Sequence, residues 1–305
     1  MHGQTTNYRQ VKPEQTRNGQ TSNHPQQISW RKFIKTPKGF VLVVLVGLTL
    51  LASLNSNENH GLMNALIAIL TALVLDWLVG ILQHSHRWFS DGGLITGLIV
   101  ADVLSATAPW YAAALTTAIA IAAKHLLKVK RKPLFNPAAA GLLVATFLFP
   151  TGQSWWGSLS LLPGWSIILL IIGGMVVTQR VNKFPQVFAF LGTYFGLLLV
   201  MAIFHLGLPS DTPGDALRVP FVNSALFLAF FMLTDPPTSP APYRQQVYFG
   251  FLSAFVSIVI FAFQGGLTYL LVGLLLANGW KAWASRNPKP SYAKSPSLVT
   301  SRGER

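Results

Sequence analysis

Three aspartates stand where charged side chains are rare. Asp76 in "LVLDWLV" and Asp102 in "IVADVLS" lie inside apolar runs, and Asp235 stands directly before two prolines. A bare carboxylate in such surroundings costs several kcal/mol, so it is usually paired, neutral or functional. The functional interpretation is a proton or sodium pathway that uses carboxylates as acid-base groups or hard oxygen ligands. The structural one is a hydrogen bond to a neighbouring helix, and both stay open for Asp76 and Asp102.

An Asn-Pro pair in "FNPAAAG" follows the basic stretch "KHLLKVKRKPL". Asn136 is suited to cap a helix with Pro137 in its first position. The alanines that follow and Gly141 allow another backbone to approach closely. Positive charge beside a helix N-terminus also suits a phosphate. Membrane topology accounts for most of this charge, so anion binding remains the alternative interpretation.

Other kinds of site are disfavoured by the sequence. The chain has no cysteine, which excludes disulfides, thiolate-bound zinc and cysteine-ligated iron-sulfur clusters within it. His84 and His86 are spaced so that they do not share a helix face, and we expect no metal site. No P-loop, dinucleotide fingerprint or Ser-His-Asp pattern is present, so we expect no oxidation of NADH by this chain alone.

The composition predicts an all-α polytopic membrane protein, because 51% of the 305 residues are hydrophobic and only 10% are charged. We expect a membrane domain over 37–284 between polar tails at 1–36 and 285–305. Ten apolar runs predict ten transmembrane helices, at about 40–54, 62–83, 92–107, 110–127, 136–149, 164–178, 185–206, 219–234, 246–263 and 267–284.

The basic residues predict the orientation of these helices. With ten crossings, 22 of the 23 Lys and Arg residues fall on one side, and only Arg218 falls opposite. This asymmetry predicts a multi-pass protein of the inner (plasma) membrane with both termini cytoplasmic. The net charge of +14 is spread over loops and tails, so we expect the lipid bilayer and no nucleic acid as a partner. Trp110, Trp155 and Trp156 are expected in the outer aromatic belt.

The third and eighth apolar runs, "GLITGLIVADVLSATAP" and "NSALFLAFFMLTDPPTSP", are both short and end in a Thr-containing, Pro-terminated turn. Each is third in a group of five, and corresponding runs lie about 125 to 130 residues apart. We therefore expect two inverted repeats, at about 40–150 and 164–284. Folds of this kind place their site between the repeats, where short helices meet.

Five ordered segments, "DGGLITGLIV", "APWY", "AAKHLL", "FNPAAAGLL" and "FFMLTDPPTSP" with "YRQQVYFG", resemble those of a known family. It contains the RnfD protein of the Rnf complex and the NqrB protein of the sodium-translocating NADH:quinone reductase. The resemblance implies a ten-helix, urea-channel-like fold, a flavin, redox partner subunits, and electron transfer coupled to sodium or proton movement. It implies an ion-pathway role for Asp235. The motif positions taken as cofactor-binding are Lys124, Phe135, Asn136, Pro137, Thr234, Asp235 and Arg244.

One departure from this family concerns the flavin. Its members carry FMN on a threonine in a Ser-Gly-Ala-Thr-like motif between the fifth and sixth helices, where this chain has only "TGQSWWGSLSLLPG". We expect no covalent flavin, and the leading hypothesis is a membrane subunit that binds FMN or riboflavin non-covalently. The alternative is a channel or carrier for a small solute or ion that has the same fold without redox chemistry. A third hypothesis is a membrane anchor for an electron-transfer or biosynthetic complex.

Overall fold

The computed structural model describes residues 33–54, 60–83, 91–129, 132–150, 152–206, 218–264, 266 and 268–286. His84, His86 and most of the two predicted tails lie outside these residues. The described residues form ten α-helices, each coinciding with one predicted apolar run, and an antiparallel hairpin of β1 (Lys128–Val129) and β2 (Lys132–Pro133). The helices are α2 (Pro37–Leu54), α3 (His60–Leu82), α4 (Asp91–Val103), α5 (Trp110–Leu126), α6 (Pro137–Leu148), α7 (Ile167–Val181), α8 (Phe184–Ile203), α9 (Val219–Phe227), α10 (Tyr243–Gln264) and α11 (Tyr269–Arg286).

The outer surface of the bundle is apolar. Five helical segments are long and apolar enough to cross a bilayer: α2, α3, α8, α10, and α7 together with the short 3-10 helix η2 (Gly164–Ser166) before it. Large apolar side chains such as Leu70, Ile172 and Phe188 point outward and are more than half exposed. A soluble protein would bury such a surface, whereas a bilayer covers it. The prediction of an all-α polytopic membrane protein is confirmed.

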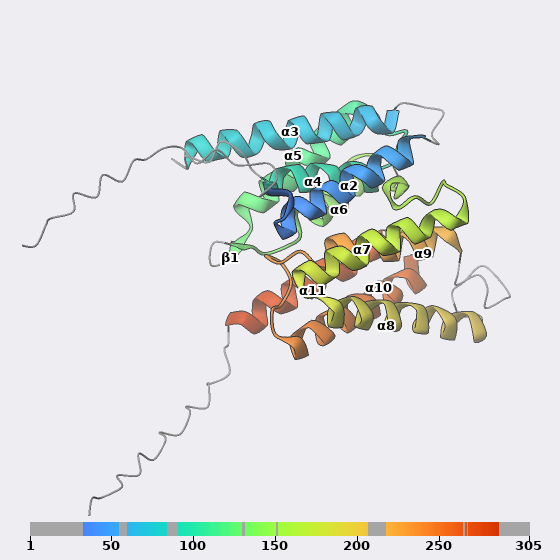
Figure 1. Ribbon diagram of the computed structural model, residues 1–305. Helices are drawn as coiled ribbons and strands as arrows, with labels where there is room; N and C mark the ends of the chain where they lie inside the picture. Colours follow the sequence, from blue (N-terminus) through green and yellow to red (C-terminus); the bar gives the residue numbers. More distant parts are fainter. Residues whose placement is uncertain are drawn as a thin grey trace, which may run out of the picture.

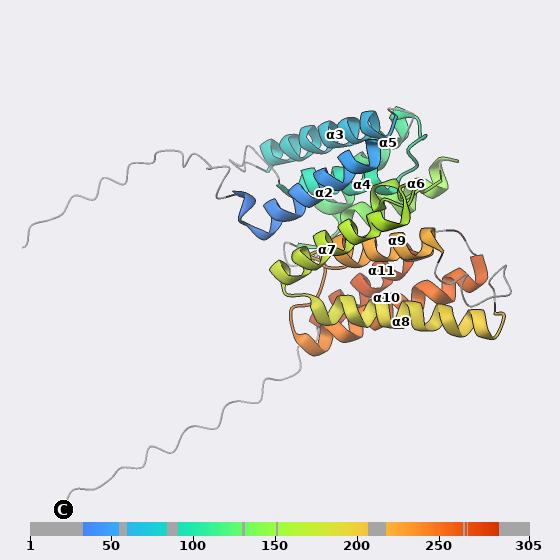
Figure 2. The ribbon, with the colours of Figure 1, turned by 45° about the vertical axis from the view of Figure 1, so that its right-hand side comes forward.

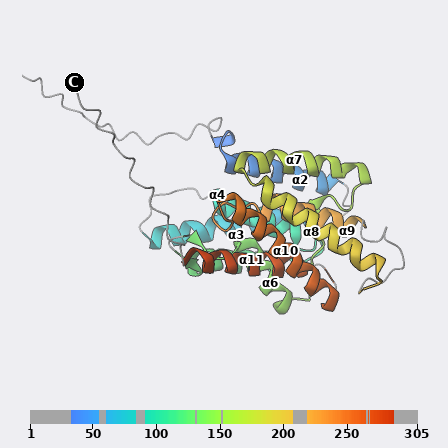
Figure 3. The same ribbon diagram turned by 90° about the horizontal axis from the view of Figure 1, so that it is seen from below.

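The two halves of the chain form two groups of helices, with α3 to α6 on one side and α8, α10 and α11 on the other (Figures 1 and 2). The pairings correspond: α3 packs on α5 and α5 on α6, as α8 packs on α10 and α10 on α11. Contacts between the halves include α2 with α7, which lie side by side in Figure 3, and α6 with α11. The pairings are those of a duplicated unit, while the inverted relation itself stays a prediction.

The start of α2, the β1–β2 hairpin and the end of α11 lie at the same end of the bundle, here called the hairpin end (Figure 1). An even number of antiparallel helices requires this arrangement. The described basic residues at helix ends, including Lys124, Arg180 and Arg286, belong to this end, while Arg218 starts α9 at the opposite end. The distribution of charge is the one that the sequence predicts, and the assignment of the hairpin end to the cytoplasm remains a prediction.

The segment between α6 and α7 corrects one expectation. Trp155 and Trp156 are 1% and 2% exposed, so they are core residues and do not belong to an aromatic belt. Trp155 adopts a positive φ of 51° at the start of the 3-10 helix η1 (Trp156–Ser158), and the Trp156 indole N–H donates to the carbonyl of Ala101 at 2.6 Å. The segment folds back into the bundle. Trp110 is 58% exposed, as a belt residue would be.

Candidate functional site

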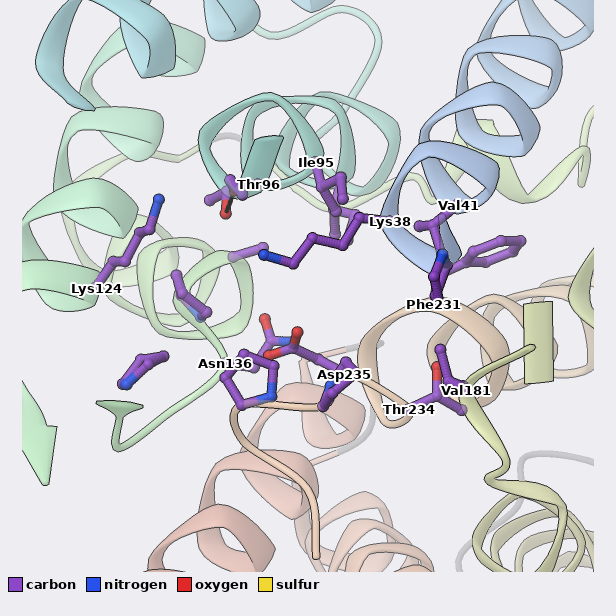
Figure 4. A pocket seen from close by; sticks show the side chains of 18 residues that line it. Lys38, Val41, Ile95, Thr96, Lys124, Asn136, Val181, Phe231, Thr234 and Asp235 are labelled. Carbon is purple, nitrogen blue, oxygen red and sulfur yellow. Dashed lines mark hydrogen bonds between the residues drawn. The ribbon is translucent and has the colours of Figure 1, made fainter. Parts of the chain in front are cut away.

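A cavity of about 180 Å³ lies at the hairpin end, where helices of both halves begin or end (Figure 4). Its walls come from the start of α2, the first half of α4, the ends of α5 and α7, the start of α6 and the segment after α9. The lining side chains are mostly apolar, and the polar ones are Lys38, Thr96, Lys124, Asn136, Thr234 and Asp235. Five of the seven predicted cofactor residues are therefore brought together: Lys124, Asn136, Pro137, Thr234 and Asp235.

The wall formed by α6 depends on the predicted cap. The Asn136 carbonyl oxygen accepts from the backbone N–H of Ala139 at 3.1 Å, and Pro137 occupies the first helical turn. The side-chain amide of Asn136 donates to the carbonyl of Met232 at 3.0 Å. Its backbone N–H donates to the side chain of Asn278 at 2.8 Å. The predicted cap is confirmed, and the same residue also joins α6 to elements of the second half.

The opposite wall begins with a π-helix, η4, over Leu228–Met232 that continues α9. The N–H of Leu233 donates to the carbonyl of Leu228 at 2.8 Å, five residues back. The wider turn leaves the carbonyl of Met232 available to Asn136, and Phe231 lines the cavity. Single π-turns are frequent at functional sites. No sequence feature had indicated this one.

The proline-rich segment after η4, residues 233–242, is held by side chains from three other helices. Gln186 of α8 donates to the carbonyl of Leu233 at 2.5 Å, and Asn278 of α11 donates to that of Thr238 at 3.1 Å. Lys183, just before α8, donates to the carbonyl of Pro240. Burial, more than the charge of nearby Lys281, lowers the pKa of Lys183 to about 8. These contacts fix a segment without regular structure, and Asp235 with it.

Lys124 and Asp76 form an ion pair beside the cavity. The Lys124 ammonium and the Nε2 atom of His125 each lie 2.5 Å from an oxygen of Asp76. A side chain at Gly93 of α4 would collide with this carboxylate, so the glycine makes room for the pair. Asp76 is thus held by two basic side chains, and a large part of the Lys124 charge is already compensated.

Asp235 points into the cavity from the segment after η4 (Figure 4). One of its oxygens accepts from the Thr238 hydroxyl at 2.8 Å. Burial raises the pKa of the Asp235 carboxyl above its ordinary value, although that hydrogen bond and the nearby lysines act in the opposite direction. The side chain thus combines a carboxyl that holds a proton more readily than usual with access to the cavity.

Three predicted residues lie elsewhere. Phe135 is half-buried and does not line the cavity, and Arg244 is exposed in the first turn of α10. Asp102 is fully buried, and one of its oxygens lies 2.9 Å from the Thr49 hydroxyl of α2. Asp102 faces Gly157 of η1, whereas Asp76 faces Gly93, nine residues earlier in α4 and about 14 Å away along the helix. The cavity and Asp102 are separate places in the fold.

Comparison with known proteins gives the family. A family model described as the NQR2, RnfD, RnfE family matches residues 24–160 and 157–287, most of the chain. The chain belongs to the NQR2, RnfD, RnfE family. The matched residues contain every element that lines the cavity, from α2 to the segment after η4.

Curated members of the NQR2, RnfD, RnfE family include the D-subunit of the ion-translocating oxidoreductase complex from Pseudomonas paraeruginosa. It is 24% identical over 63% of this chain and 71% of its own length. The protein of the same name from Shewanella amazonensis is 23% identical over 70% and 80% of the two chains. The D-subunit of the proton-translocating ferredoxin:NAD(+) oxidoreductase complex of Clostridium ljungdahlii is 24% identical over 62% and 71%.

Lys38 is a cavity residue that the sequence prediction missed. It lies in the first turn of α2 and reaches into the cavity between α4 and Asp235 (Figure 4). In the sequence it is one more basic residue ahead of an apolar run, the usual pattern of a topology signal. Only the approach of α2 to α4 and α7 distinguishes Lys38 from the other basic residues ahead of that run.

Proposed function

We propose that this protein is the membrane subunit of an ion-translocating oxidoreductase complex and that it binds FMN or riboflavin non-covalently in the cavity at the hairpin end. Relatives that carry the name of such a subunit support the first part of the proposal. The observation that carries the second is the meeting of Lys124 and Asn136, from the first half, with Thr234 and Asp235, from the second, around one cavity.

The residues of the cavity fit a flavin. Val41, Ile95, Ile99, Val181 and Phe231 provide an apolar and aromatic lining for a flat ring system. Polar side chains stand at a few places, as in most cofactor sites, and lysine is suited to an anionic tail. A bound flavin supplies one- and two-electron redox chemistry.

The chain's own residues have distinct parts in this proposal. Both polar ends of the Asn136 side chain already have partners, so Asn136 positions the start of α6 against Met232. Asp235 is the residue in the cavity that holds or releases a proton, and we assign the ion-pathway role to it first. Asp76 neutralises Lys124, and its ion-pathway role, like that of the distant Asp102, stays a prediction.

The test is the visible absorption spectrum of the full chain, purified in mild detergent, before and after denaturation. Yellow protein whose colour passes into the supernatant on denaturation is the expected result, and chromatography of the supernatant then separates FMN from riboflavin. Colour that stays with the precipitate means a covalent flavin and contradicts the non-covalent proposal. A colourless folded protein contradicts flavin binding and favours the channel or carrier.

A further inference from the structure

The Lys38 ammonium is the cation of the cavity whose charge has no partner among the described residues. There, the ion pairs with a separation of at most 4.0 Å are those of Asp76 with Lys124 and His125. Asp235 lies close enough to act on Lys38 electrostatically, yet it forms no such ion pair with it. Lys124, by contrast, donates to Asp76 at 2.5 Å. An anion entering the cavity therefore meets one compensated and one uncompensated lysine.

The backbone that carries Lys38 is held in place. The Thr36 hydroxyl oxygen accepts from the N–H of Gly39 at 3.1 Å and so caps the first turn of α2. Arg180, near the end of α7, donates to the carbonyl of Lys35 at 3.0 Å and lies 4.7 Å from the centre of the Phe40 ring. These contacts fix the direction in which Lys38 leaves the helix, and Figure 4 shows that this direction is into the cavity.

Burial separates the two ends of the cavity. Lys38 is an exposed residue at its mouth, whereas Ile99 and Phe231 are each 3% exposed. A phosphate monoester carries between one and two negative charges at neutral pH and remains hydrated unless it is paired. It therefore belongs at the mouth beside Lys38, with the ring of the same ligand against the apolar residues.

From this arrangement we infer that Lys38 binds the phosphate of the flavin in the cavity and makes the site selective for FMN over riboflavin. The inference rests on the proposed function and goes beyond it, since flavin binding alone leaves the two cofactors equivalent. It also moves the phosphate away from Lys124, which the sequence had favoured and which Asp76 holds in the structure.

The test is a titration of the full chain, freed of flavin in detergent, with FMN and separately with riboflavin, followed by flavin fluorescence. Lys38→Gln should weaken FMN binding by about three- to tenfold, the range for a charge-assisted contact open to solvent. Riboflavin binding should not change. Lys38→Arg should retain the preference for FMN, and high salt should reduce it. Lys35→Gln is the matched control, because Lys35 is exposed in the turn before α2 and does not line the cavity.

Size-exclusion profiles select folded protein for every variant. Equal loss of FMN and riboflavin affinity in Lys38→Gln would mean a structural role and would overturn the inference, as would unchanged FMN affinity. Equal affinity of the unaltered protein for the two flavins would also overturn it and leave the proposed function standing. Binding of neither flavin by the unaltered protein would contradict both.

Discussion

Lys124 and Lys38 differ in what surrounds their ammonium groups. The Asp76 side chain is 2% exposed and that of Lys124 is 19% exposed, so their ion pair is largely withdrawn from water. Removing one partner of such a pair leaves a buried charge without compensation, which costs more than the pair itself contributes. Lys38, at the cavity mouth, has water available when no anion is bound. The first lysine thus belongs to the stability of the fold and the second to ligand binding.

This difference predicts a strong coupling between Asp76 and Lys124. Lys124→Gln should lower the free energy of unfolding by about 2 to 3 kcal/mol, and Asp76→Asn added to it should restore part of that loss. Detergent-denaturant unfolding of the two single variants and the double variant measures the coupling. Lys128→Gln is the control, because Lys128 is exposed on β1 and should change stability by less than about 0.5 kcal/mol. Additive effects of the two single changes would refute the coupling.

Single residues were predicted well where the reason is local. Asn136 and Pro137 announce a helix start by their own chemistry, and the structure has that cap. The partners of Lys124 and Lys38 depend on side chains such as Asp76, 48 positions from Lys124, and no spacing rule gives them. The sequence therefore identified most of the cavity residues but assigned the anion site to the wrong lysine if our inference holds.

Among the elements, α5 and α6 approach each other at Gly141. A Cβ atom at this position would lie 2.7 Å from the carbonyl oxygen of Thr116 and equally close to the side chain of Ala120. The contact is between backbones, so it has no flexible side chain that can move aside. Small residues serve this purpose between membrane helices, and the prediction of close packing here is confirmed.

Gly141→Val should therefore push α5 and α6 apart and destabilise the protein by about 1 to 3 kcal/mol. The loss of flavin should follow, because α6 forms a wall of the cavity. Gly192→Val is the matched control, since nothing lies within 4 Å of a Cβ atom at Gly192 on α8. Thermal unfolding with flavin release as a second signal compares the two variants. Equal stability of both would show that the close approach does not matter.

Elements whose form depends on tertiary contacts escaped the sequence analysis. The π-helix after α9 has no sequence signature, and it exists together with the bond from Asn136 to the Met232 carbonyl. The tryptophans of "QSWWG" looked interfacial because they follow an apolar run, yet Trp156 is held inside by the carbonyl of Ala101. Helix positions followed from hydrophobicity, whereas the shape of the segments between them follows from what they contact.

The whole molecule presents its basic residues at one end, which predicts how it lies in the membrane. The turn after α4 and the β1–β2 hairpin stand at the two ends of α5, so they should face opposite sides of the bilayer. The native chain has no cysteine, which makes single-cysteine labelling simple. Thr107 and Lys128 are both exposed and suit this experiment.

In intact cells, an impermeant maleimide should label Thr107→Cys but not Lys128→Cys, and both should react after permeabilisation. The reason is the excess of Lys and Arg at the hairpin end, which keeps that end in the cytoplasm. The converse pattern would reverse the orientation and with it the side from which the cavity opens. Labelling of both positions in intact cells would contradict their placement on opposite sides.

The central claim is that the cavity between the two halves holds a flavin. Its most direct test is the molar ratio of flavin to purified, folded protein in two tryptophan variants. Ile95→Trp fills the cavity from α4, while Leu70→Trp places the same side chain on the outer face of α3, where Leu70 is 61% exposed. We predict that Leu70→Trp retains the flavin content of the unaltered protein and that Ile95→Trp loses most of it. Retention of the full flavin content by a folded Ile95→Trp variant would contradict the claim.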